Sequence, residues 1–379
     1  MATIAFATLL EHGHLLPTFK LARALKARGH QVFYLMDSAN QNLIRSQGFD
    51  TLTVEGWMEL ASPMTLSDNH ILSSEIFYRC ANKIAEADRE VRIDLLIVDS
   101  FVPSAALLAH QQKIPYLLLH TNLDTATAVM LMNRAVDNLA NRWDAPTRFL
   151  KVPQLVLCPS EFDFKHPEGR SQGVYNIEAS IDLERKEASL PQDRIDAHRP
   201  LIYCSLGSQR HLYAETRHFF QTVIDAMGFH SDLQMIVSVG EGLGSSDFSR
   251  ITSNIAVMNW APQLEILKKA RLMITHGGLG TIKECIYFGV PMIVFPMSRE
   301  QPLNAARVVY HGLGIRGDIH KINVEQMRDL ISKAMRNEDS YHRVEVMKNM
   351  FRESEASGKG VKIIENIVHL IRTQYNFPR

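Results

Sequence analysis

Residues 275–284, THGGLGTIKE, join a histidine and a glutamate through a glycine-rich run that lacks charge until Lys283. The run follows an apolar segment, so we expect a strand to end at His276 and a helix to begin near Thr281. Glycines let the backbone approach a ligand, and a helix N-terminus offers N–H groups with a partial positive charge. The pattern indicates a phosphate site with His276 as a further donor. Thr281 and Glu284 also match a capping box, which any helix can use. The glycines of the run are Gly277, Gly278 and Gly280.

Two further loops follow apolar runs of the same half of the chain. SLGSQ (205–209), which contains Ser208, comes after LIYCSL, and NWAPQ (259–263) comes after IAVMNW. Trp260 would stack on a nucleobase there, and Gln263 would read the edge of that base. A lone tryptophan more often packs in a core, and a lone glutamine more often lies on the surface. The place of both residues just past a strand end favours the nucleotide hypothesis.

Other phosphate signatures are absent from the sequence. GEGLGSS (240–246) has Ser245 where the dinucleotide fingerprint needs its third glycine, and the Walker pattern does not occur. No Asp-x-Asp pair occurs either, and Asp182-x-Glu184 comes closest. That pair lies in a charged stretch and not at a strand end. We therefore expect no metal and no cofactor.

The first half of the chain offers groups for acid–base chemistry. EHGHLLP, after the first apolar run, contains His12 and His14, and DLLIVD ends in Asp99. A carboxylate bonded to one ring nitrogen fixes the tautomer of a histidine and stabilises its protonated form. The histidine pair lacks a third ligand at a suitable spacing for zinc. Without further information, a satisfied loop histidine is the better reading of His14, and an N-cap for FVPSAALLAHQQ is an alternative for Asp99.

Alternating apolar runs and amphipathic stretches must position these residues. Between the first two runs, PTFKLARALKARGH places Pro17 at an expected first helical position and Gly29 at the stop. The alternation fades between 150 and 200, where the polar segment 186–200 reads as a linker, and then restarts at 201. We expect two α/β domains with parallel sheets and a cleft between them. The expected strands are 3–9, 31–36, 94–99, 115–120, 201–206, 233–239, 255–260, 272–276 and 291–296.

Composition excludes several classes of function. Lys plus Arg and Asp plus Glu are both 41, so no basic excess is available for a nucleic acid. No run reaches the length of a membrane span, and MATIAFATLL resembles a first strand more than a signal peptide. Four distant cysteines without a C-x-x-C pair indicate reduced, buried thiols. We expect a cytoplasmic protein that binds neither nucleic acid nor membrane and that is a monomer or a weak dimer.

The residues from Trp260 onward resemble a known nucleotide-sugar signature. WAPQLEIL, THGGLGTIKECIYFGVPMIVFPMSREQPLNAARV and the early segment GHLLPTFKLARAL are similar to family 1 glycosyltransferases, the UDP-dependent enzymes with the GT-B fold, and especially to bacterial natural-product and macrolide-type members. The resemblance implies two Rossmann-like domains whose parallel sheets face each other across a cleft. It implies an acceptor-binding domain at 1–190, a nucleotide-sugar domain at 191–355, and a C-terminal helix at 356–379 that packs back on the first domain.

The resemblance also implies roles for individual donor-site residues. Trp260 would stack on uracil, and Gln263 would lie near the base and ribose. Glu284 would accept from the ribose hydroxyls, and Glu300 and Gln301 would bind the sugar hydroxyls. The segment departs from plant members, which have His-Cys-Gly-Trp-Asn-Ser where this chain has HGGLGT, and this difference leaves the choice of sugar open. The diphosphate would be held by Ser208, His276, Gly278, Gly280 and Thr281.

For the reaction, the resemblance places the general base three residues before Pro17, on His14, with Asp99 as its orienting partner. It implies single displacement with inversion of an α-linked donor and no metal. Apolar residues in 62–79 and 121–136 would form an acceptor surface, although at helical spacing such residues are more often core. They include Ile71, Phe77, Tyr78, Met130 and Met132.

We expect an inverting hexosyltransferase that moves glucose from UDP-glucose to a hydroxyl of a lipophilic small molecule. A thymidine-diphosphate deoxysugar transferase of antibiotic biosynthesis would share nearly all of these motifs. A relative of the cell-wall N-acetylglucosaminyltransferase would share the fold, but its lipid acceptor favours a basic and apolar face that the sequence lacks. A catalytically silent accessory homologue is the alternative from another class.

Overall fold

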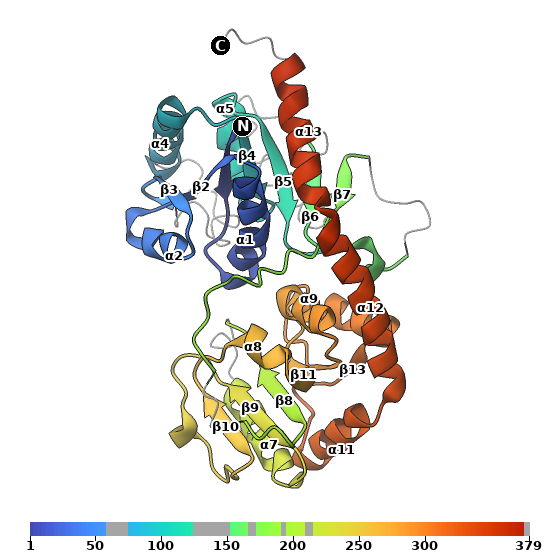
Figure 1. Ribbon diagram of the computed structural model, residues 1–379. Coiled ribbons are helices and arrows are strands. Elements are labelled where there is room, and N and C mark those ends of the chain that lie inside the picture. Colours follow the sequence, from blue (N-terminus) through green and yellow to red (C-terminus); the bar gives the residue numbers. More distant parts are fainter. Residues whose placement is uncertain (58–74, 124–151, 166–171, 191–194, 209–214, 375–379) are drawn as a thin grey trace. The chain divides into compact units, whose positions relative to one another are not determined.

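A computed structural model describes residues 1–57, 75–123, 152–165, 172–190, 195–208 and 215–374. The chain forms two compact units (Figure 1). Unit 1 contains residues 1–160, 165–185 and 354–379, and unit 2 contains 161–164 and 186–353. The sequence placed its boundaries after 190 and 355, and it gave no sign that residues 161–164 belong with the second unit.

The sheet of unit 1 is parallel throughout and has the order β3-β2-β1-β4-β5-β6-β7. Its strands lie at β1 Thr3–Ala7, β2 Gln31–Met36, β3 Asp50–Thr53, β4 Leu95–Asp99, β5 Tyr116–His120, β6 Gln154–Val156 and β7 Val174–Asn176. Its helices lie at α1 His12–Ala27, α2 Gln41–Ser46, α4 Glu75–Val91, α5 Pro103–Gln111 and α13 Lys359–Gln374.

Both faces of this sheet are covered, which explains why its strands read as continuous apolar runs. Ile4 and Phe6 of β1 pack in a core with α1 and α13, while Ala5 and Ala7 face a second core with α4 and α5. Val361, Ile364 and Val368 of α13 contribute to the first of these cores. The C-terminal helix therefore packs within unit 1, beside α1.

Unit 2 has a second parallel sheet with the order β10-β9-β8-β11-β12-β13. Its strands lie at β8 Leu201–Ser205, β9 Gln234–Ser238, β10 Ile255–Met258, β11 Ala270–Thr275, β12 Met292–Val294 and β13 Gly314–Arg316. Its helices lie at α7 Thr216–Met227, α8 Gln263–Leu267, α9 Leu279–Phe288, α10 Gln301–Tyr310 and α11 Val324–Met335, and α12 at Glu338–Ser357 extends past the unit boundary. The prediction of two α/β domains with parallel sheets is confirmed.

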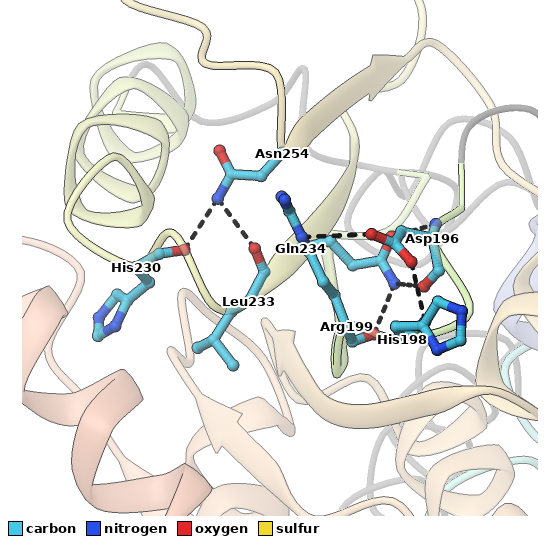
Figure 2. A network of polar contacts seen from close by, with 7 residues as sticks. All are labelled: Asp196, His198, Arg199, His230, Leu233, Gln234 and Asn254. Carbon is cyan, nitrogen blue, oxygen red and sulfur yellow. Dashed lines mark hydrogen bonds and ion pairs between the residues drawn. The ribbon is translucent and has the colours of Figure 1, made fainter.

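Two amide side chains, buried Gln234 and half-buried Asn254, fix the segments that precede β8 and β9 (Figure 2). The Gln234 side chain donates to the carbonyls of Asp196 and Arg199 at 2.5 and 2.6 Å and accepts from the Asp196 N–H at 2.9 Å. Asn254 donates to the carbonyls of His230 and Leu233, both at 3.0 Å. The end of the polar linker is thus pinned to the first residue of β9.

Several sequence predictions were wrong about boundaries. The first helix begins at His12 and not at Pro17, because the Glu11 carbonyl accepts the N–H groups of His14 and Leu15 and so closes an earlier turn. The segment 150–200, where the alternation fades in the sequence, still contains β6 and β7, which extend the first sheet. Both strands have three residues, too few to show as an apolar run.

The cysteines and Asp182, residue types that often bind metals, are buried in the structure. All four cysteines are buried and outside any disulfide, as the sequence indicated. Asp182, the nearest approach to a metal-binding pair, is buried and accepts from the Arg23 guanidinium at 3.2 Å. Within the described part of the chain, no three metal-ligating side chains come together as a group.

None of the described helices combines the length and apolarity that crossing a membrane requires.

Candidate active site

The ends of β1 and β4 bring His14 and Asp99 together in unit 1. His14 lies in the first turn of α1, and its Nδ1 is 2.8 Å from Asp99 Oδ2. Asp99 is fully buried, and its second oxygen accepts from the N–H of Phe101 at 2.9 Å. A buried carboxylate at this distance requires the ring proton on Nδ1, which leaves the Nε2 lone pair to accept a proton. The dyad therefore has the geometry of an oriented general base.

Two more residues hold the His14 ring. The Thr121 hydroxyl, just past β5, is 3.1 Å from His14 Nδ1, and the Phe101 ring packs edge-on at 5.0 Å between centroids. The sequence reasoning missed both, although Thr121 directly follows a predicted strand and could have been found by the same rule that selected Asp99. Asp99 is not the N-cap of α5, because Val102 occupies that position. His12 is exposed.

In unit 2, the helix after the glycine-rich run begins earlier than predicted. α9 starts at Leu279 with Gly278 as its N-cap, so Thr281 and Glu284 do not form a capping box. Gly278 has no side chain and provides no cap hydrogen bond. The N–H groups of the first turn lack intrahelical acceptors, and the helix dipole adds a partial positive charge there. This end of α9 is suited to an anion.

The glycines around His276 have different structural roles. A Cβ on Gly207 would lie 2.5 Å from His276 Cε1, and one on Gly278 would lie 2.7 Å from Nε2. These two glycines form a slot for the imidazole. Gly277 has a φ of +89°, and a Cβ there would meet Val294 at 2.7 Å. A Cβ on Gly280 would have nothing within 4 Å, so Gly280 is where a ligand could approach the backbone.

His276 is neutral at physiological pH. Burial lowers its pKa to about 4. Its Nδ1 is enclosed and has no hydrogen-bond partner. The tautomer with the proton on Nε2 avoids a buried unpaired N–H. His276 can therefore donate a hydrogen bond to an anion without carrying charge.

The predicted nucleoside residues lie close together. Gln263 Nε2 is 2.5 Å from Glu284 Oε2 and 3.4 Å from Thr281 Oγ1, which joins the start of α8 to α9. Glu284 is buried, whereas Trp260 is 46% exposed and presents an aromatic surface just before α8. Glu187, from the linker, accepts from the N–H of Leu264 at 3.0 Å and so fixes the first turn of α8.

The predicted sugar-binding pair stands at the start of α10. Glu300 is half-buried at the N-cap, and Gln301 is buried at the first helical position. Gln301 Oε1 accepts from the N–H groups of Met297 and Ser298 at 2.9 and 3.2 Å. Only its amide nitrogen can then act toward a sugar hydroxyl. Ser208 lies half-buried in the turn after β8, two residues beyond Leu206.

The proposed acceptor residues are not placed. Ile71, Met130 and Met132 lie outside the described residues, and so do the side chains of Phe77 and Tyr78.

Comparison with known proteins identifies the family. The model for "UDP-glucoronosyl and UDP-glucosyl transferase" matches residues 149–352, more than half of the chain. The chain belongs to this family. Its sequence is 24% identical over 386 residues to the NDP-glycosyltransferase YjiC of Bacillus subtilis (strain 168), covering 96% of each protein. It is 25% identical over 343 residues to the oleandomycin glycosyltransferase of Streptomyces antibioticus, covering 83% of this chain and 78% of that one.

A solved structure of similar fold is the glycosyltransferase of kitacinnamycin. It has a TM-score of 0.78 and 22% identity, covering 97% of this chain and 98% of that one. This likeness supports the GT-B fold class that the sequence predicted. With the family match, it makes the chain a glycosyltransferase of the family 1 type.

Proposed function

We propose that this protein is an inverting glycosyltransferase that moves glucose from UDP-glucose to a hydroxyl of a lipophilic small molecule. The observation that carries the proposal is the contact between His14 Nδ1 and the fully buried Asp99 at 2.8 Å. A catalytically silent homologue has no need of a histidine held in one tautomer by a buried carboxylate. The same contact is what removal of a proton from a hydroxyl demands.

The donor side of the proposal rests on unit 2. The start of α9 offers N–H groups that no side chain caps, and neutral His276 adds an uncharged donor. The diphosphate would bind there, with Ser208, Gly278, Gly280 and Thr281 around it. Trp260 would stack on the uracil. Gln263 and Glu284 would contact the ribose, and Glu300 and the amide nitrogen of Gln301 would contact the sugar. Backbone donors and the dipole of α9 would then hold the leaving group without a metal.

The proposed reaction takes place in one step. The acceptor oxygen attacks the anomeric carbon from the side opposite the diphosphate, while its proton passes to His14 Nε2. The bond from the anomeric carbon to the diphosphate oxygen breaks, and its electron pair leaves with UDP. Asp99 stabilises the imidazolium that forms. An α-linked donor therefore gives a β-glycoside, and the proton is later lost to solvent.

The test separates chemistry from nucleotide binding. With UDP-glucose and a panel of phenolic acceptors, His14→Ala and Asp99→Asn should each lower kcat by roughly 10²–10⁴-fold, the usual contribution of a general base. Both variants should bind UDP as the wild type does, measured by titration calorimetry. His12→Ala is the matched control, because His12 is exposed on the same helical turn, and it should keep kcat within about threefold.

Other outcomes would favour other functions. Tighter binding of dTDP than of UDP, with turnover of a dTDP-sugar, would assign the protein to deoxysugar transfer. Full function of His14→Ala would favour an accessory protein. If EDTA abolishes UDP binding or turnover, the metal-free donor site is wrong.

A further inference from the structure

We propose that Asn304 is a positioning residue of the donor site, which fixes the glycine-rich loop before α9 through one buried hydrogen bond. The proposal rests on the proposed function, because it assigns to that loop the diphosphate of the donor. The proposed role of Asn304 involves no contact with the ligand. It acts through the backbone of Gly277.

The peptide of Gly277 is held on both sides by buried side chains. Asn304 Nδ2 donates to the Gly277 carbonyl at 3.0 Å, and the Gly277 N–H donates to Thr275 Oγ1 at 3.3 Å. Asn304 is 1% exposed and Thr275 is 0% exposed. Gly277 has a φ of +89°, a conformation that glycine adopts without a steric penalty, so the two hydrogen bonds and not the backbone itself select this orientation. Gly277 joins His276 to the uncapped start of α9. Its orientation therefore sets the direction of the His276 ring and of the N–H groups in the first turn of α9.

The polar side of α10 gives Asn304 a rigid base. Gln301, Asn304 and Arg307 follow one another at intervals of three residues, and all three are buried. Residues at this spacing share one side of a helix. Buried amide and guanidinium groups are uncommon unless they are paired. Here the Gln301 oxygen accepts from the loop before α10, and the other two residues reach away from the helix to separate segments.

Arg307 anchors α10 to residues 161–164. Its Nε is 2.8 Å from Asp163 Oδ1, with both side chains buried, and its guanidinium lies over the Phe164 ring at 4.7 Å from the centroid. One turn later, His311 Nε2 donates to the carbonyl of Phe162 at 3.0 Å. These contacts attach α10 to residues 161–164 within unit 2, which gives Asn304 a fixed base from which to hold Gly277. Residues 161–164 thus support the donor loop, although they lie more than 100 positions before it in the sequence.

The isosteric variant Asn304→Asp gives a test with a distinctive pH profile. An ionised aspartate would place a carboxylate oxygen against the Gly277 carbonyl, whereas a protonated one can donate as asparagine does. Burial raises the pKa of such a carboxyl group. The quantity to compare is the dissociation constant of UDP for Asn304→Asp divided by that for the wild type at the same pH. At pH 5 the two constants should therefore agree within about threefold. At pH 8 this ratio should rise to roughly tenfold or more, because the hydrogen bond to the Gly277 carbonyl is lost and the N–H groups that face the charged ligand are no longer held in place. The ratio removes the titration of UDP itself.

Two further variants complete the experiment. Asn323→Asp is the matched control, because Asn323 is the N-cap of α11 and aspartate caps equally well, so its ratio should stay near one at every pH. Thr275→Val removes the other bond to Gly277 without a titrating group, and should weaken UDP binding equally at pH 5 and pH 8. It also covers the case in which Asn304→Asp does not fold at pH 8.

The readouts distinguish the two proposals. If the wild type does not bind UDP, the proposed function fails, and amide hydrogen exchange in residues 275–281 still tests the role of Asn304. In that case, we expect the exchange rate of Asn304→Asp, divided by the rate of the wild type at the same pH, to be higher at pH 8 than at pH 5. If the wild type binds UDP but the ratio for Asn304→Asp does not change with pH and exchange is unaltered, the positioning role is wrong.

Discussion

Gly280→Ala should stabilise the protein while weakening its binding of UDP. A Cβ at this position meets no atom within 4 Å, and φ does not lie in the left-handed region. Replacing glycine by alanine under these conditions raises the free energy of unfolding by about 0.4–1 kcal/mol, chiefly by restricting the unfolded chain. For a unit of this size, that change raises the melting temperature by roughly 1–4 °C.

The same methyl group would stand where the diphosphate is proposed to approach the first turn of α9. Hydrogen bonds to charged groups contribute about 1.5–3 kcal/mol, so losing one such bond weakens binding of UDP by roughly tenfold or more. Differential scanning fluorimetry without ligand measures the stability, and titration calorimetry measures the affinity. Opposite signs in the two measurements cannot arise from general damage to the fold.

Gly13→Ala is the matched control. Gly13 is the second residue of α1, as Gly280 is of α9, and a Cβ there also meets no atom within 4 Å. This variant should gain a similar stability and bind UDP as the wild type does. If Gly280→Ala is stabilised and binds UDP with unchanged affinity, the nucleotide does not approach the start of α9. The assignment of the diphosphate site would then be wrong.

Two further predictions concern His276. Gly207→Ala and Gly242→Ala impose the same backbone strain, since φ is +77° and +78°, but only the first adds a Cβ against the imidazole. Gly242→Ala should therefore lose about 1–2 kcal/mol of stability in urea unfolding, and Gly207→Ala should lose more. Only Gly207→Ala should weaken UDP binding, by roughly tenfold. The pKa of His276 is lowered to about 4 in the folded state, so the unfolded chain takes up the proton first as the pH falls. The free energy of unfolding should therefore decrease between about pH 6.5 and pH 4, by at most about 3 kcal/mol. Urea unfolding of His276→Asn over this range should show a shallower decline, and an equal decline would contradict the neutral assignment.

The strands that the sequence revealed were those with long apolar runs. β2 was predicted with its observed bounds, and β8 within one residue, because both are buried on two sides. β13 has only three residues, Gly314–Arg316, and is recognised by its pairing with β12 and not by its composition. Such short strands are defined by pairing with a strand that is distant in the sequence. A local sequence pattern carries no information about that pairing.

The candidate site shows the same division between local and distant information. The family resemblance selected His14, in the loop after the first apolar run, and Asp99, at the end of a later one, and the structure brings their side chains to 2.8 Å. Asn304 and Asp163 could not be selected, because one lies inside a helix and the other in a segment with no strand pattern. The role proposed for Asn304 depends on contacts across 27 and, through Arg307, 144 positions of sequence.

The glycines of the donor loops illustrate why residue type alone gives an incomplete mechanism. The sequence suggests one reason for all of them, close approach of phosphate to the backbone. The structure separates three reasons: Gly207 and Gly277 adopt a positive φ, Gly207 and Gly278 make room for the His276 ring, and among these four only Gly280 leaves space that no protein atom fills. A loop that binds an anion through backbone N–H groups must first fix the direction of those groups. It follows that substitutions at Gly207, Gly277 and Gly278 should reduce stability and binding together, whereas Gly280 is the position at which the two effects separate.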